Sequence, residues 1–137
     1  MVRGITGVFV LLAGFACNKL EEVIPTTADF EMTDQTLVVT GTFSSNAHTT
    51  TGTASIFEKD GVKTLLIENF MTDNGPDLNV YMATGTDATS YIDLGDLKGT
   101  QGSLSYTLPS EFDHTAQPFV LIWCVQFSVL FGNAELQ

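Results

Sequence analysis

The residues with the most specific chemistry in this sequence are its two cysteines. Cys124 lies in the middle of an apolar stretch, FVLIWCVQFSVLF, at residues 119–131, and Cys17 lies near the start of the chain. A buried thiol can act as a redox group, ligate a metal or cofactor, or fill a core as a small apolar side chain. No Lys, Arg or His is close to Cys124 in the sequence to stabilise a thiolate, so a ligand role is a better prediction than a free nucleophile. An inert core residue is the alternative.

Other candidate groups are two histidines and a short acidic segment. His48 and His114 are too scattered, relative to the cysteines, to form a recognisable zinc spacing. Asp73, Asn74 and Asp77 place three oxygen-bearing side chains within one DNGPD segment, which makes them a weak Ca²⁺ candidate. The spacing is not that of an EF-hand, and the Gly-Pro pair predicts a tight turn first. We therefore assign no metal site.

No catalytic residue set can be assigned from the sequence. Gly-x-Ser-x-Gly is absent, as is a Gly-rich loop leading into a helix. Enzymatic activity is therefore not our expectation.

The elements that must position these groups are predicted to be short strands. Runs rich in β-branched and aromatic residues are separated by turn residues, and Lys59-Asp60-Gly61 between two apolar runs predicts a hairpin. The sequence therefore predicts an all-β fold, a single small antiparallel β-sandwich over residues 30–137. The expected strands lie at 36–43, 52–58, 62–70, 77–83, 90–95, 103–109, 118–124 and 125–131.

The strand that carries Cys124 is apolar on both faces. Even-numbered residues of 119–124, including Cys124, share one face, and odd-numbered residues share the other. We therefore expect a central strand that is covered on both sides.

The N-terminal segment predicts export. Arg3 precedes an apolar run at residues 8–16, which is shorter than the roughly 20 residues that cross a bilayer, so residues 1–16 are typical of a signal peptide. LLAGFAC resembles the lipobox of bacterial lipoproteins. Gly14 and Phe15, three and two places before the cysteine, depart from the usual pattern. We expect lipidation at Cys17 and a tether at residues 17–29. A plain secretory signal with an incidental cysteine is the alternative.

Lipidation and charge together predict how the chain is attached to a membrane. We expect an exported lipoprotein in the periplasm or on the cell surface of a diderm bacterium, anchored by acyl chains. Sixteen acidic residues against five basic ones give a net charge of −11, which excludes nucleic-acid binding through phosphate neutralisation. A cationic ligand remains compatible with this charge. If Cys17 is lipidated, Cys124 is left as an unpaired thiol.

Several segments in the same order resemble the electron-transfer DM-thirteen domain family. They are GTFSSNAHTTTGTASIF at residues 41–57, and those at 69–83, 91–109 and 120–136. The motifs are an Asn-Gly-Pro-Asp turn, a Leu-Lys-Gly-x-Gln-Gly turn, and an Ile-Trp-Cys strand before Phe-Ser-x-x-Phe-Gly. The resemblance covers about residues 30–137.

The resemblance implies a small extracellular β-sandwich whose signature cysteine falls on Cys124. That cysteine is a proposed redox thiol or attachment point for a prosthetic group, with haem as the candidate cofactor. His48 matches a family position and is the candidate second ligand or proton partner, against the alternative of an ordinary loop histidine. We therefore expect an extracytoplasmic electron-transfer domain that meets a redox partner protein. The alternative is a non-catalytic cell-surface binding or scaffolding module, with Cys124 as core and a sugar, cation or protein as its ligand.

Overall fold

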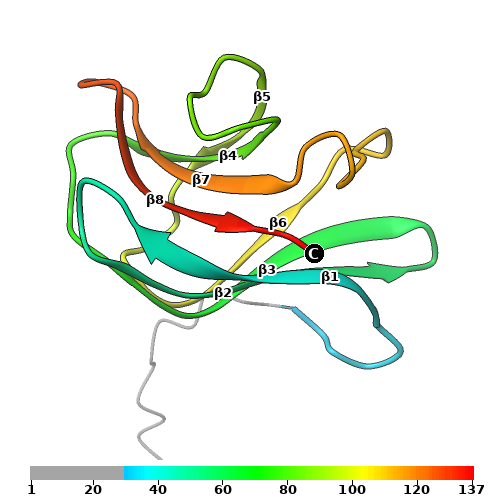
Figure 1. The fold of residues 1–137 in the computed structure, drawn as a ribbon. Helices are drawn as coiled ribbons and strands as arrows, with labels where there is room; N and C mark the ends of the chain where they lie inside the picture. Colours follow the sequence, from blue (N-terminus) through cyan, green and yellow to red (C-terminus); the bar gives the residue numbers. More distant parts are fainter. Residues whose placement is uncertain (1–29) are drawn as a thin grey trace, which may run out of the picture.

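Eight antiparallel strands form the part of the chain that the computed structural model describes, residues 30–137 (Figure 1). The predicted signal peptide, the tether and Cys17 lie outside these residues. Among the described residues, no helix has the length and apolarity needed to span a bilayer. The strands are β1 (Thr36–Ser45), β2 (Thr50–Lys59), β3 (Val62–Thr72), β4 (Leu78–Ala83), β5 (Tyr91–Asp96), β6 (Gln101–Thr107), β7 (Phe119–Cys124) and β8 (Val129–Glu135).

The strands form one curled sheet in the order β5-β4-β7-β8-β1-β2-β3-β6 (Figure 1). The first part of β1, Thr36–Thr42, pairs with β2, and its last part, Phe43–Ser45, pairs with β8. The prediction of an all-β antiparallel fold is therefore confirmed. The sandwich is not confirmed, because β1 belongs to both halves and joins them into a continuous half-barrel.

One main core fills the concave side of this sheet. Its fully buried members come from both halves, for example Ile56 and Ile67 on one side and Val80 and Ile122 on the other. Burial of these side chains from two directions gives the hydrophobic stabilisation that holds the two halves of the curled sheet against each other. Cys124 is a member of this core.

The β2–β3 hairpin has the predicted turn. Lys59 pairs with Val62, and the two residues between them, Asp60 and Gly61, have φ angles of 51° and 79°. A two-residue loop with both central residues at positive φ matches the twist of the flanking strands, and Asp-Gly is a favoured sequence for it. The local residue types were sufficient to specify this turn.

The segment after Cys124 differs from the expected strand at 125–131. Residues 125–128 form a turn, and β8 begins only at Val129. The Val125 amide donates to the Asp77 carbonyl oxygen at 2.8 Å, and Ser128 has a φ of 53°, which no regular strand permits. The apolar alternation therefore continues through a turn, with Phe127 left exposed.

The two faces of β7 are used as the alternation predicts. The even-numbered residues Val120, Ile122 and Cys124 lie in the main core. The odd-numbered residues lie on the convex face in a second, smaller cluster, where side chains from neighbouring strands cover them. Within the described part of the chain, that face carries a layer of side chains and no second sheet.

Candidate functional site

Cys124 is the last residue of β7 and is only 1% exposed. Its neighbours in the sheet are Leu78 on β4 and Val129 on β8. Its thiol is free of any disulfide. The side chain belongs to the main core and lies at the end of the half-barrel where β7 turns into β8.

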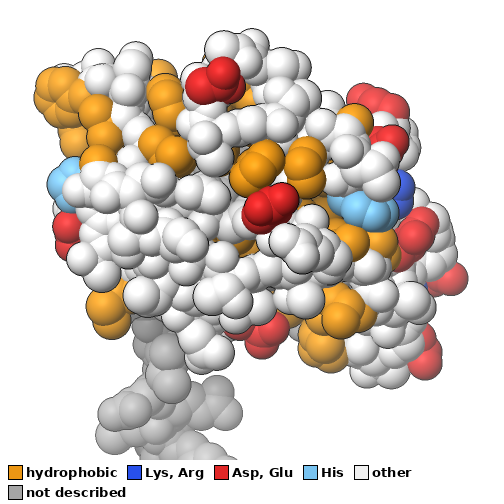
Figure 2. Space-filling model, viewed as in Figure 1, with side chains coloured by type: hydrophobic (Ala, Val, Ile, Leu, Met, Phe, Trp, Pro, Cys, Tyr) orange, Lys and Arg blue, Asp and Glu red, His pale blue; other side chains and the backbone are white. Residues whose placement is uncertain are grey.

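A pocket of about 300 Å³ reaches Cys124 from this end. Its surface is mostly apolar, and Phe127, which is 63% exposed, stands at its mouth. Hydrophobic side chains are visible over the β7–β8 turn in Figure 2. The lining residues are His48, Asn74, Gly75, Pro76, Cys124, Phe127, Val129 and Phe131.

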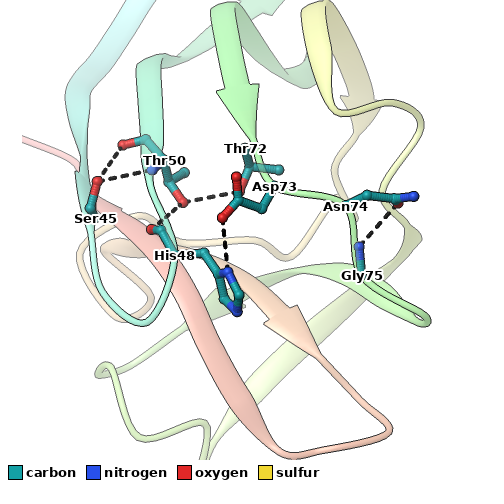
Figure 3. Close-up of polar contacts among 7 residues, drawn as sticks. All are labelled: Ser45, His48, Thr50, Thr72, Asp73, Asn74 and Gly75. Carbon is teal, nitrogen blue, oxygen red and sulfur yellow. Dashed lines mark hydrogen bonds and ion pairs between the residues drawn. The ribbon is translucent and has the colours of Figure 1, made fainter.

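His48 is placed in this pocket by the loop between β1 and β2. The amides of Asn46 and His48 donate to the Phe131 carbonyl oxygen at 2.9 and 3.3 Å, which fixes the loop on β8. The imidazole packs on the Phe131 ring with a centroid distance of 3.9 Å. Its Nδ1 lies 2.9 Å from Asp73 Oδ2 (Figure 3). An Nδ1–H that donates to this carboxylate leaves Nε2 as the basic nitrogen.

A buried hydroxyl pair ties the two halves of this arrangement together. Thr50 Oγ1 lies 3.1 Å from Thr72 Oγ1 and donates to the His48 carbonyl oxygen at 3.2 Å (Figure 3). The Thr50 amide donates to Ser45 Oγ at 2.9 Å. Thr72 immediately precedes Asp73, so this network fixes the loop of His48 relative to the start of the 73–77 turn.

Two glycines permit the close packing around the pocket. A Cβ at Gly132 would overlap the side chain of Thr50, and a Cβ at Gly75 would lie 2.9 Å from Cζ of Phe131. Gly132 is the glycine of the Phe-Gly motif, and Gly75 that of the Asn-Gly-Pro-Asp turn. Both motif glycines are therefore explained by close approach to the residues that build the site.

The 73–77 turn gives no support to the Ca²⁺ candidate. Asp73 is engaged by His48, and Asn74 Oδ1 accepts a hydrogen bond from the Gly75 amide at 3.0 Å. Within residues 30–137, no group of three or more His, Cys, Asp or Glu side chains could hold a metal ion. The Asp77 carbonyl oxygen instead accepts the Val125 amide and so joins this turn to the β7–β8 turn.

The residues present do not fit a haem. A volume of about 300 Å³ lies at the lower end of the range for small-molecule sites, and a tetrapyrrole is larger than the ligands that such sites bury. Cys124 is also covered by the side chains around it. Residues 74–76 line the pocket, so a macrocycle entering it would have to displace this turn.

Two residues predicted from the sequence, Cys124 and His48, line the same pocket although they are far apart in the chain. Asn74 joins them there, and Asp73 contacts His48 from outside the lining. His114 lies in a turn and does not line the pocket. The sequence analysis did not identify Asp73 as the partner of His48, and only the tertiary structure brings the two together.

Comparison with known proteins gives a family match. No curated protein and no solved structure matches the chain. The family described as Electron transfer DM13 matches residues 42–136, which include His48, the 73–77 turn and Cys124. The match covers more than half of the chain and confirms the resemblance seen in the sequence. This chain belongs to the electron transfer DM13 family.

Proposed function

We propose that this chain is an electron-transfer domain whose redox group is the Cys124 thiol. The observation that carries the proposal is a pocket whose lining includes both Cys124 and His48, with Asp73 hydrogen-bonded to the imidazole. A thiol that gives up an electron must also lose its proton, and the pocket supplies a base for it.

The proposed step is a one-electron oxidation of the thiol. Cys124 loses one electron to a one-electron acceptor protein, and its S–H proton passes to Nε2 of His48. Asp73 stabilises the resulting imidazolium through the Nδ1 hydrogen bond. The thiyl radical is then reduced by a one-electron donor, and His48 returns the proton. Each cycle moves one electron from donor to acceptor.

The apolar walls of the pocket suit this use of a thiol. Cys124 is only 1% exposed, which limits the access of water and peroxides to the sulfur. Oxygen transfer to a cysteine requires such access and leads up the oxidation ladder to irreversible products. A restricted pocket favours electron exchange over oxygen transfer.

The proposal extends to the anchoring of the domain. Lipidation at Cys17 would hold the domain at a membrane, in the periplasm or at the cell surface, with residues 17–29 as the tether. Growth with a radiolabelled fatty acid tests this directly. Label should enter the full chain and disappear in Cys17→Ala, and label that persists in this variant would contradict lipidation.

A photogenerated one-electron oxidant, followed by titration of the remaining thiol after unfolding, tests the proposed function. The wild type should lose its thiol with one electron removed per protein. His48→Gln should slow this loss about tenfold or more, because the base is removed. His114→Gln is the matched control and should oxidise like the wild type. Equal rates in the two histidine variants would overturn the role of the pocket.

Haem is tested separately by adding haemin to the full chain and to Cys124→Ala. We expect no Soret shift that depends on Cys124, because the pocket does not fit the macrocycle. A shift seen only with the cysteine present would show that the 74–76 turn moves and that haem is the cofactor.

A non-catalytic binding or scaffolding module is the second candidate function. The observation that favours it is the 1% exposure of Cys124 and its place in the main core, where a cysteine serves as an ordinary small apolar residue. In that case the thiol would react only after unfolding. Cys124→Ala would then lower the free energy of unfolding by about 1–2 kcal/mol and leave binding of a sugar, cation or protein ligand unchanged.

A further inference from the structure

The residue next to Cys124 begins a line of stacked aromatic rings on the opposite face of the sheet. Trp123 lies 6.2 Å from Tyr81 between ring centroids, with an interplanar angle of 24°. Tyr81 in turn lies 3.9 Å from Tyr91, with an interplanar angle of 8°. Neighbouring strands β7, β4 and β5 contribute one ring each.

This line runs from the pocket to solvent. Consecutive residues of a strand point to opposite faces, so the single peptide step from Cys124 to Trp123 crosses the sheet. Tyr81 is only 4% exposed, whereas Tyr91 at the end of the line is 44% exposed. Trp123 at the start of the line is partly buried, so the most buried ring is the middle one and the most exposed ring is the last.

We propose that Trp123, Tyr81 and Tyr91 form an electron relay between the Cys124 pocket and the convex face, with Tyr91 as the exit to the partner. The step from Cys124 to Trp123 rests on the proposed function. The transfer among the three rings does not depend on it.

The relay works by successive one-electron steps that balance in electrons and protons. An acceptor protein on the convex face removes one electron from Tyr91, and the phenol proton leaves to water. Tyr81 gives an electron and its phenol proton to the Tyr91 radical and restores that phenol. Trp123 restores Tyr81 in the same way with its indole N–H. The Cys124 thiol finally supplies an electron to the Trp123 radical, which regains its proton from solvent, while the thiol proton passes to His48.

The surroundings of the middle ring suit this role. Burial, and after it hydrogen bonding to Tyr91, raise the pKa of Tyr81 to about 12, so the phenol keeps its proton until an electron leaves. The negative charges of Asp93 and Asp77 act on the same ring. Negative charge near the ring lowers the cost of removing an electron from it.

Stacked aromatic residues also stabilise sheets without any redox role, so the test needs a matched tyrosine outside the line. The sequence supplies one, since it has three tyrosines and a single tryptophan. Among residues 30–137, Tyr106 stacks on no other ring, and its ring centroid lies 4.7 Å from the Lys98 ammonium. Tyr106→Phe is therefore the control for Tyr81→Phe.

Pulse radiolysis with the azide radical, which oxidises tryptophan to the indolyl radical, tests the same ring contacts in the reverse direction, with an electron passing from tyrosine to the Trp123 radical. In the full chain, the indolyl absorption should decay as tyrosyl absorption grows, at a rate independent of protein concentration. Tyr81→Phe should slow this transfer at least about tenfold, and Tyr106→Phe should leave it within about twofold. Equal slowing in both variants would overturn the relay.

A second arm separates this inference from the proposed function. Cys124→Ala should keep the transfer from tryptophan to tyrosine, because the rings remain. If the transfer persists but thiol loss in the wild type does not follow oxidation of the rings, the relay stands and the redox role of Cys124 fails. If Tyr81→Phe and Tyr106→Phe lose their thiol equally fast to a bulky surface oxidant, the relay fails while the redox role stands.

Discussion

The orientation of His48 depends on contacts on three sides. Its backbone is fixed to Phe131, its ring packs on the same residue, and Asp73 engages Nδ1. The His48 side chain is 38% exposed and that of Asp73 59% exposed. The pair is therefore partly screened by solvent, and its value lies more in fixing the tautomer than in stabilising the fold.

We expect Asp73→Asn to slow oxidation of Cys124 by a few-fold and at most about tenfold, with little change in the free energy of unfolding. The amide can still contact the ring but cannot stabilise an imidazolium. Thiol loss under photo-oxidation, compared with urea unfolding of the same variant, checks both parts. A large loss of stability with an unchanged oxidation rate would contradict this role.

A second prediction at this scale concerns alkaline pH. Burial raises the pKa of Tyr106 from its ordinary value of 10.0 to about 12. The unfolded chain then ionises this phenol near pH 10 while the native state retains the proton. The stabilisation that Tyr106 contributes should therefore be fully present below pH 10 and be lost as the pH rises from 10 to 12. Urea unfolding across this range measures the fall, and Tyr106→Phe should make it shallower than in the wild type.

At the scale of elements, the contact between Thr50 at the start of β2 and Gly132 on β8 holds the pocket together. No side chain larger than hydrogen fits at position 132 without displacing Thr50. Thr50 in turn supports the loop of His48 and the hydroxyl of Thr72. The pairing of β1 with β8 thus depends on a glycine that any alternation pattern would treat as a weak strand residue.

We expect Gly132→Ala to lower the free energy of unfolding by about 1–3 kcal/mol, because the added methyl group forces the buried Thr50 away. Gly85→Ala is the matched control. A Cβ there would meet only Asp87 Oδ1 at 3.6 Å, an ordinary contact. Urea unfolding of both variants measures the loss. Equal losses of unfolding free energy in the two variants would show that the close approach to Thr50 is not the reason for glycine at position 132.

The sequence predicted most of the strands but not the way they join. Alternation and the Asp60-Gly61 turn are local, so the strands and the hairpin could be inferred. The turn before Val129 could not, because an apolar run with the same alternation continues through it. The contact between His48 and Asp73 could not be predicted either, because it forms only when the β1–β2 and β3–β4 connections meet in space.

Acidic side chains far outnumber basic ones over the whole molecule. Figure 2 shows acidic side chains scattered over the visible face with very little basic colour between them. The three lysines among residues 30–137 each donate to a backbone carbonyl oxygen, on Thr33, Phe112 and Ser105. Within these residues no lysine forms an ion pair with a carboxylate. Self-repulsion of the acidic surface therefore acts against the folded state.

We expect added NaCl to stabilise the domain at neutral pH, because salt screens this repulsion more than it weakens any attraction. The urea midpoint should rise steadily with salt concentration. Chloride binding is excluded as a cause if sodium fluoride has the same effect at equal ionic strength. A midpoint that falls with salt would mean that attractive pairs dominate.

The closure of the half-barrel by β1 and β8 also decides when the chain can fold. Phe43 on β1 pairs with Ala134, and Thr40 and Gln137 exchange backbone hydrogen bonds. Strands from opposite ends of the domain must therefore meet, which is slow and requires the C-terminal residues to have been synthesised. A nascent chain emerging from the ribosome lacks the strand that completes its sheet until β8 has been synthesised. It stays unfolded during that time, which is the state in which a polypeptide can be threaded through a secretion channel.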